Sequence, residues 1–250
     1  MINWREKWAA FGVHFLITLV LSAAAAALVF LAWFPAPFHK MLGGTTLFEI
    51  MVLCDLGLGP LSSFIVYNSR KTRRALLFDY TIIAIVQISA FVYGVYAVAN
   101  NRPAYIVFVG DRFEVIPAGA IDDADLARGG AYDERPWGPQ LVAIRDPKDV
   151  EEHNQMLFSG LGGKDYSVLP EYYIPFEQDL AELRRRAKPV TDLEQRHEEA
   201  QPLVAEAVAE LQIPVERLVY MPVMHKDGFW TVLLDSDTGQ PVSWLPVDPY

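Results

Sequence analysis

The sequence predicts a membrane protein of mixed class: three transmembrane helices followed by a small α+β domain with an antiparallel sheet. Hydrophobic residues make up 52% of the 250-residue chain, yet its net charge is −10. These properties separate along the chain, because residues 1–100 carry seven Lys/Arg and four Asp/Glu, a net charge of +3, whereas residues 101–250 carry −13. One homogeneous domain would not divide in this way, so we predict a membrane anchor over 1–100 and a soluble acidic domain over 101–250.

The first predicted span covers residues 10–34, which contain no Asp, Glu, Lys or Arg. About 20 apolar residues suffice to cross the hydrocarbon core of a bilayer. Arg5 and Lys7 precede this run, as they would in a secretory signal, and the alanines at 23–27 resemble a cleavage region. The run is too long for the apolar core of a signal peptide and continues past the alanines, so a retained transmembrane helix is the better interpretation.

The second and third spans are predicted over 43–67 and 75–99. Basic residues are unequally distributed among the short segments around them: two precede the first span, one lies between the first two spans, and four lie within 68–74. Short loops rich in Lys and Arg stay in the cytoplasm. We therefore expect a multi-pass protein of the bacterial inner membrane with a cytoplasmic N-terminus and a periplasmic C-terminal domain.

The soluble domain begins with two predicted strands around a turn at Gly110 and Asp111, where glycine can adopt a positive φ. A closing meander is predicted from turn residues at Asp227-Gly228 and at 237–239. The remaining elements follow from apolar periodicity and from proline and acidic residues at helix starts. The expected strands are 105–109, 112–116, 140–145, 217–224, 229–235 and 240–247, and the expected helices are 121–128, 147–160, 176–187 and 201–211.

The usual signatures of enzymes and metal sites are missing from this sequence. It contains no G-x-S-x-G nucleophile elbow, and the glycines at 160–165 (GLGGKD), which we interpret as a helix end, lack the spacing of a phosphate loop. His197 begins H-E-E without the second histidine of a zinc motif, and Cys54 is the single cysteine. We therefore predict no enzyme activity, no catalytic residue, no metal and no cofactor. The acidic domain also disfavours binding to nucleic acid.

Asp55 is the one residue whose predicted location is energetically unfavourable. An acid near the middle of a bilayer costs a few kcal/mol on insertion scales and should face protein rather than lipid. Asp55 lies twelve residues before Tyr67, and Gln87 lies twelve residues after Ala75. At ~1.5 Å per residue, both lie about 18 Å from the same membrane surface, so antiparallel helices can bring them together. We expect Gln87 to donate a hydrogen bond to Asp55.

Gly57, Gly59 and Pro60 follow Asp55 on the same predicted span. Glycine lets another helix approach closely, and proline frees a backbone carbonyl and permits a kink. Two interpretations of this site remain open: Asp55 and Gln87 form a polar clasp within the bundle, or the site is a docking point for the transmembrane helix of a partner. Ion transport is a weaker third interpretation, because three spans with one central acid make a poor pathway.

Short stretches in every part of the chain resemble one protein family. They are residues 55–60 (DLGLGP), 73–74 (RR), Asp79, 93–96 (YGVY), 102–105 (RPAY), 111–115 (DRFEV), 172–176 (YYIPF) and 234–248. In these residues and their order the chain resembles the type IV pilin accessory proteins of the TfpX/TfpZ type. The resemblance implies an inner-membrane accessory protein or chaperone that assists the stability, assembly or surface display of a cognate type IV pilin, and it implies no catalytic residues.

The resemblance also suggests a mechanism, because type IV pilins wait in the inner membrane as single-span subunits with a periplasmic head. As a hypothesis, the anchor holds the transmembrane helix of the pilin while the acidic domain contacts the head. The alternative is a membrane-anchored periplasmic sensor or adaptor unrelated to pili, which would require a small-molecule pocket in the soluble domain. A membrane-bound enzyme is a third hypothesis, disfavoured by the missing motifs.

Overall fold

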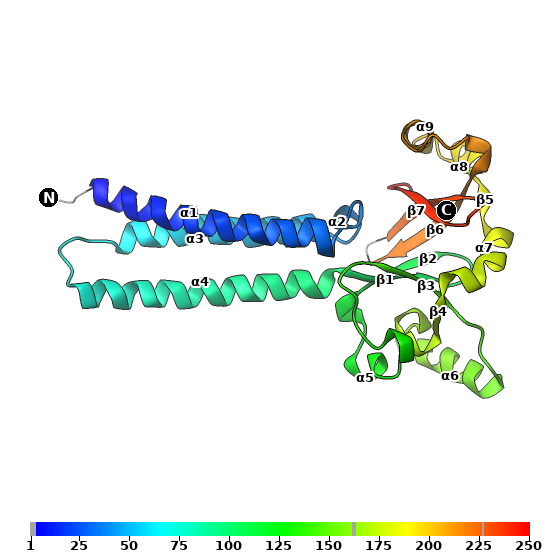
Figure 1. Cartoon of the computed structure of the whole chain (residues 1–250), viewed down its shortest axis with the longest axis horizontal. Helices are drawn as coiled ribbons and strands as arrows, with labels where there is room; N and C mark the ends of the chain where they lie inside the picture. Colours follow the sequence, from blue (N-terminus) through cyan, green and yellow to red (C-terminus); the bar gives the residue numbers. More distant parts are fainter. Residues whose placement is uncertain (1–3, 162–163, 227) are drawn as a thin grey trace. The chain divides into compact units, whose positions relative to one another are not determined.

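The computed structural model describes residues 4–161, 164–226 and 228–250. The chain folds as two compact units, Met1–Asn101 and Arg102–Tyr250 (Figure 1). Two features expected from the sequence, the helix end at Gly162-Gly163 and the turn that begins at Asp227, lie outside the described residues.

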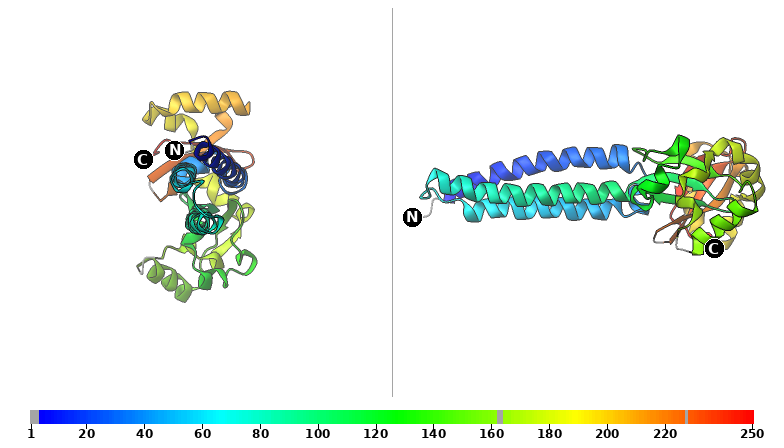
Figure 2. Two further views of the ribbon diagram at one scale, coloured as in Figure 1. Left: turned by 90° about the vertical axis from the view of Figure 1, so that its left-hand side faces the viewer. Right: turned by 90° about the horizontal axis from the view of Figure 1, so that it is seen from below.

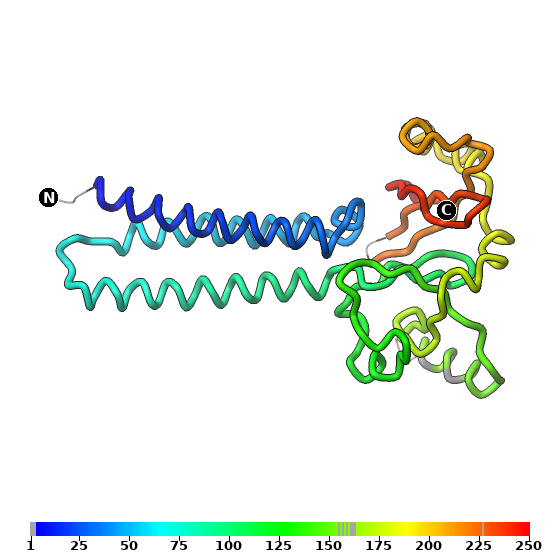
Figure 3. The backbone as a smooth tube through the Cα atoms, viewed as in Figure 1, coloured from blue at the N-terminus to red at the C-terminus, as the bar shows by residue number. Residues whose placement is uncertain are grey.

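The first unit consists of long helices joined by short connections, as the chain path in Figure 3 shows. Three of its helices are long and apolar enough to cross a membrane, which confirms the prediction of three such helices. α3 packs against both α1 and α4, and the two further views in Figure 2 show the three helices running side by side. The elements are α1 (Trp4–Leu28), continued by a π-helical turn η1 (Val29–Trp33), α2 (Phe38–Met41), α3 (Gly44–Val66) and α4 (Arg73–Asn101).

The connection between the first two long helices is held by close packing. Pro35 and Pro37 have no backbone N–H and so end the helix that precedes them. Phe34 is fully buried, and its ring would lie only 2.8 Å from a Cβ at Gly44, so only glycine fits at the start of α3. The end of α4 is fixed to this connection, because Asn101 Nδ2 donates a hydrogen bond to the backbone oxygen of Leu42, 2.7 Å away.

The second unit is built on an eight-stranded sheet with the order β4-β3-β1-β2-β6-β7-β8, and β5 pairs with β6. The predicted α+β class is confirmed. The sheet is mixed rather than wholly antiparallel, because β1 pairs with β3 and β2 pairs with β6 in parallel. The strands are β1 (Pro103–Phe108), β2 (Phe113–Pro117), β3 (Gln140–Ile144), β4 (Tyr173–Pro175), β5 (Lys188–Pro189), β6 (Leu218–His225), β7 (Gly228–Asp235) and β8 (Pro241–Leu245).

The parallel pairs have a physical reason in the connections. Parallel neighbours need a connection of a dozen or more residues, and residues 109–139 connect β1 to β3 while residues 118–217 connect β2 to β6. The first predicted hairpin is confirmed: β1 and β2 are antiparallel, and Gly110 between them has φ 93°.

β4 and the helix α8 were not predicted. The helices are α5 (Asp123–Leu126), α6 (Val150–Leu161), α7 (Leu180–Arg186), α8 (Val190–Arg196) and α9 (Ala200–Leu211), with 3-10 turns η2 (Ala118–Ala120), η3 (Gly130–Tyr132), η4 (Tyr166–Val168), η5 (Pro170–Tyr172), η6 (Phe176–Asp179) and η7 (Val215–Arg217).

Two larger apolar clusters and a smaller one around Met156, Leu169 and Tyr172 lie among the described residues of the second unit. One of the two larger clusters joins α8 and α9 to β6, β7 and β8, with Leu193, Val204 and Leu233 almost fully buried in it. The other joins β1, β2, β3 and β4 to the segment around α5, with Tyr105 and Val107 at its centre. Burial on both sides of the sheet explains why β1 is buried at every position.

Candidate functional site: a polar groove between the long helices

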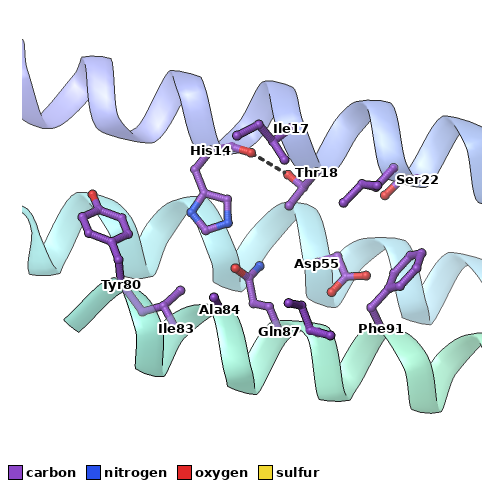
Figure 4. Close-up of a pocket in the computed structure, with 12 residues that line it drawn as sticks. His14, Ile17, Thr18, Ser22, Asp55, Tyr80, Ile83, Ala84, Gln87 and Phe91 are labelled. Atoms are coloured by element: carbon purple, nitrogen blue, oxygen red, sulfur yellow. Dashed lines mark hydrogen bonds between the residues drawn. The ribbon is translucent and has the colours of Figure 1, made fainter. Parts of the chain in front are cut away.

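The first unit contains a groove of about 410 Å³ between α1, α3 and α4. Most of the side chains that line it are apolar, and the polar ones come from all three helices. Figure 4 shows these side chains directed into the space between the ribbons. The polar residues are His14, Thr18 and Ser22 of α1, Asp55 of α3, and Tyr80 and Gln87 of α4.

Two glycines, which have no side chain, let α3 and α4 approach each other closely along one side of the groove. A Cβ at Gly59 would lie 1.8 Å from Gln87 Nε2, so the amide of Gln87 occupies the space that the glycine leaves. Nearer the other end of α4, a Cβ at Gly94 would lie 2.7 Å from Met51 Cγ. Small residues at helix contacts let backbones approach in this way. The position of Gln87 in the groove therefore depends on Gly59.

Polar contacts fix α1 to α3 near the start of α1. His14 Nδ1 and Ser63 Oγ are hydrogen-bonded at 2.5 Å, and Ser63 is fully buried. Lys7 Nζ donates to the backbone oxygens of Phe64 and Ile65 at 3.1 and 3.3 Å. Those carbonyls belong to the last turn of α3, where a cation is favoured by unpaired backbone oxygens. The aromatic ring of Phe64 also packs against Trp8, with ring centroids 5.0 Å apart.

Three buried polar atoms in the groove have no hydrogen-bond partner in the part of the chain that the structure describes: Ser22 Oγ, Asp55 Oδ2 and Gln87 Nε2. Ser22 and Asp55 are themselves only 4% and 7% exposed. Polar atoms without partners in an apolar environment each cost several kcal/mol in a bilayer, where water does not replace the missing bond. Each of the three long helices contributes one of these atoms, so the groove as a whole is left with unmet hydrogen-bonding capacity.

The structure brings together four of the five site residues proposed from the sequence. Asp55 and Gln87 line the same groove, Gly59 contacts Gln87, and Pro60 is buried next to Gly59. Gly57 does not belong to this site, because it is exposed and a Cβ there would meet nothing within 4 Å. Gly57 lies two residues from Gly59, and two residues turn a helix by about 200°, so the two glycines face different ways.

The expected hydrogen bond from Gln87 to Asp55 is not formed, which corrects the prediction from the sequence. Gln87 Nε2 is the only donor of that side chain, and it has no partner among the described residues. The amide lies instead against the backbone at Gly59. Counting residues predicted the shared depth of Asp55 and Gln87 in the bundle, but the direction of the amide depends on its rotamer.

The polar side of α1 was not predicted from the sequence, although the spacing of its polar residues indicates a common helix face. His14, Thr18 and Ser22 recur every four residues, which places them on one face of a helix. Thr18 satisfies its hydroxyl group within α1, by donating to the backbone oxygens of His14 and Phe15. Tyr80 and Gln87 are likewise seven residues apart on α4 and share a face. Such polar stripes in apolar helices indicate the side that faces protein.

The second unit has a larger cavity of about 790 Å³, and its four arginine and glutamate side chains are held in ion pairs. Arg145 Nη2 lies 2.7 Å from Glu152 Oε1, and Arg186 Nε lies 2.8 Å from Glu182 Oε1. Hydrogen bonds from Arg145 and from the backbone N–H of Lys148 lower the pKa of Glu152 to about 2. Among the described residues, no three His, Cys, Asp or Glu side chains are placed to hold a metal ion.

Glu114 on β2 is the most deeply buried acid among the described residues of the second unit, with 3% of the side chain exposed. Burial raises the pKa of Glu114, because a desolvated carboxylate is unfavourable, while Ser167 and Arg112 act in the opposite direction. Arg112 Nη2 lies 2.5 Å from Glu114 Oε1. The geometry of this contact is poor, since Glu114 Oε1 and Arg112 Nε both lack a hydrogen bond among the described residues. The effect of burial therefore dominates.

These features define a class of protein: a bundle of three candidate membrane-spanning helices with a polar groove, followed by a small α+β unit. The chain matches the family model of the fimbrial assembly protein FimB over residues 2–43. It is 30% identical over 230 residues to the fimbrial assembly protein of serogroup I from Dichelobacter nodosus, an alignment that covers 90% of each chain. The chain belongs to this fimbrial assembly protein family, which confirms the family predicted from its sequence.

Two further relatives come from the same organism. The fimbrial assembly protein of serogroup E1 is 29% identical over 230 residues, again 90% of each chain. The one of serogroups C1 and C2 is 36% identical over 110 residues, which is 44% of this chain and 84% of the relative. No solved structure matches the chain.

Proposed function

We propose that this protein is a non-enzymatic accessory protein, or chaperone, of the bacterial inner membrane that assists the stability, assembly or surface display of a cognate type IV pilin. Membership of a fimbrial assembly family supports a role in fimbrial biogenesis. In our proposal the single transmembrane helix of the pilin enters the groove between α1 and α4, and the acidic second unit contacts the pilin head.

The observation that carries this proposal is the set of unpartnered polar atoms in the groove. Ser22 Oγ, Asp55 Oδ2 and Gln87 Nε2 are buried among apolar side chains of three candidate membrane helices. Lipid chains offer no hydrogen bonds, so these atoms remain unsatisfied unless a polar group of another molecule reaches them. A protein that served only as an anchor would gain nothing from such a groove, whereas a holder of another transmembrane helix would.

The topology that we propose follows from the basic residues around the spans. Four Lys/Arg within 68–74 and two before α1 favour the cytoplasm for these segments, and three crossings then place the second unit in the periplasm. The pilin head would be accessible to the second unit only in this orientation. Fusions of alkaline phosphatase and of a cytoplasmic reporter after residues 70 and 250 test the topology: phosphatase activity is expected at 250 only.

The direct test of the function is a clean deletion in a strain that makes type IV pili, followed by immunoblots for the pilin in membrane and sheared-surface fractions. We expect surface pilin to fall and to return on complementation. The membrane pool then separates the possible steps, since degraded pilin indicates a role in stability and retained pilin a role in assembly. Unchanged pilin in both fractions would contradict the accessory function for that pilin.

A periplasmic sensor or adaptor is the second candidate, because the second unit has a cavity of about 790 Å³. Such a protein would act independently of pilin. The ion pairs of Glu152 with Arg145 and of Glu182 with Arg186 already satisfy charged groups that would bind a small ligand. The groove of the first unit, with its unsatisfied atoms, therefore supports the accessory function better.

A further inference from the structure

The three unsatisfied atoms of the groove differ in their hydrogen-bonding character. Asp55 Oδ2 accepts a hydrogen bond when the carboxylate is ionised, Gln87 Nε2 only donates, and Ser22 Oγ does both. Two other polar side chains of the groove are already engaged, since His14 is bonded to Ser63 and Thr18 to the backbone of α1. Among the unsatisfied atoms, a visiting group therefore meets one acceptor, one donor and one hydroxyl.

This combination restricts the chemistry of the visiting group. An aliphatic side chain satisfies neither Asp55 nor Gln87. An ammonium group only donates, so it would leave Gln87 Nε2 unpaired, and a carboxylate only accepts, so it would face Asp55 without a proton between them. A hydroxyl donates and accepts through a single oxygen, whereas a carboxamide presents an acceptor oxygen and a donor N–H₂ group on two separate atoms. The carboxamide also carries no charge into the bilayer, where each charge is costly.

The size of the groove agrees with a side chain rather than with a single solvent molecule. Its volume of about 410 Å³ is more than ten times the roughly 30 Å³ that one water molecule occupies in the liquid. Apolar side chains such as Ile17, Leu21 and Phe91 surround the polar atoms. A transmembrane helix would bury its own apolar side chains against these residues and direct one polar side chain inward.

We propose that the groove recognises a partner transmembrane helix by a neutral side chain that both donates and accepts hydrogen bonds, a carboxamide, placed at the depth of Asp55 and Gln87. The inference rests on the proposed function in that the partner is a transmembrane helix. The carboxamide oxygen accepts from Gln87 Nε2, and its N–H₂ group donates to Asp55 Oδ2.

The test uses the full-length protein in phosphatidylcholine vesicles and three synthetic transmembrane peptides of about 20 leucines. The central residue of the peptides is Asn, Leu or Lys, and binding is measured by energy transfer at a peptide density low enough for the peptides to be monomeric. We expect the Asn peptide to bind about tenfold more tightly than the Leu peptide, a ratio that two interhelical hydrogen bonds of ordinary strength produce. Equal binding of the Asn and Leu peptides, or tighter binding of the Lys peptide, would overturn the inference.

Two glycines supply a matched pair of variants. Gly59→Ala places a Cβ where the Gln87 amide lies, so this variant displaces the donor by moving the end of a flexible side chain. Gly57→Ala adds the same methyl group to the exposed side of α3, where nothing lies within 4 Å. The preference for Asn should fall in Gly59→Ala and in Gln87→Leu, and it should persist in Gly57→Ala. A preference that survives in Gln87→Leu would show that the peptide binds elsewhere and would contradict the proposal.

The outcome is distinguishable from that of the deletion experiment. If the Asn preference is absent but deletion still removes surface pilin, the accessory function stands and the carboxamide inference fails. If the preference is present but pilin is unaffected by deletion, the groove does recognise such a helix and the pilin function fails.

Discussion

The amide nitrogen of Gln87 on α4 lies where a Cβ of residue 59 on α3 would be, 1.8 Å from the position that such an atom would take. Gly59 is therefore the residue that admits Gln87 to the groove. Gly57, two residues earlier on the same helix, has open space around it. A comparison of Gly59→Ala with Gly57→Ala therefore separates the effect on Gln87 packing from the general effect of alanine on a helix.

Gly59→Ala should reduce the amount of pilin that copurifies with the full-length protein, whereas Gly57→Ala should not. The loss of one interhelical hydrogen bond of about 1 kcal/mol weakens binding about fivefold. Quantitative immunoblots of pilin bound to the tagged protein measure this ratio. Equal losses in both variants would mean that the effect comes from the helix backbone and not from Gln87.

Asp55→Leu should reduce copurification of pilin without unfolding the second unit, because Asp55 belongs to the first unit and its Oδ2 has no internal partner to lose. We expect a reduction of about fivefold or more, equivalent to one lost hydrogen bond. Glu49→Leu is the matched control, because it removes an exposed acid from the same helix. If Asp55→Leu binds pilin normally, only a structural role within the bundle is left for this residue.

Ser63→Ala should destabilise the contact between α1 and α3 by about 1 kcal/mol, because it removes the hydrogen bond to His14. Ser62→Ala should have little effect, since Ser62 is only partly buried and its hydroxyl donates to the backbone of its own helix at Leu58. Unfolding of the full chain in mixed micelles with increasing dodecyl sulfate measures the difference. A double-mutant cycle with His14→Ala tests whether the loss of stability comes from the contact between His14 and Ser63. Full additivity of the two substitutions would refute that contact.

Glu114→Gln should change how the stability of the second unit depends on pH. Burial raises the pKa of Glu114, so the folded state keeps its proton at pH values where the unfolded chain, with a pKa of about 4.3, has lost it. The wild-type protein consequently loses stability as the pH rises from the unfolded pKa through the raised folded pKa. Urea denaturation at pH 4, 6 and 8 should show that the free energy of unfolding of the Gln variant rises relative to that of the wild type as the pH increases. If the difference in unfolding free energy between the two proteins is the same at all three pH values, the pKa of Glu114 is not raised.

Glu152→Gln should have the opposite pH signature. The pKa of Glu152 is lowered to about 2 by Arg145 and the backbone of Lys148, so the contribution of this carboxylate is present above about 4.3 and disappears as the pH falls toward 2. The variant should therefore be less stable than the wild type at pH 6 and equal to it near pH 2. Hydrogen exchange in peptides from β3 and α6 locates the change, and a difference that persists at pH 2 would exclude the ion pair as its source.

The sequence predicted the three apolar helices and the depth of Asp55 and Gln87, because both follow from length and from a fixed rise per residue. It did not predict the direction of the Gln87 amide, which depends on the space left by Gly59. Among strands, the first hairpin was predicted because a glycine turn is a local signal. The parallel pairs β1–β3 and β2–β6 were missed because pairing between distant segments has no local signal. The unbroken apolar run in β1 was the one indication of a strand covered on both faces.

The division of the groove among three helices has a consequence for biosynthesis. α1 and α3 can associate as soon as both have left the ribosome, because the hydrogen bond between His14 and Ser63 joins these two helices directly. The donor of Gln87 and the wall formed by α4 are added only when the third helix is inserted. Since chains are made from the N-terminus, the nascent protein acquires its first helix pair early, but the groove is complete only after synthesis has passed Phe91.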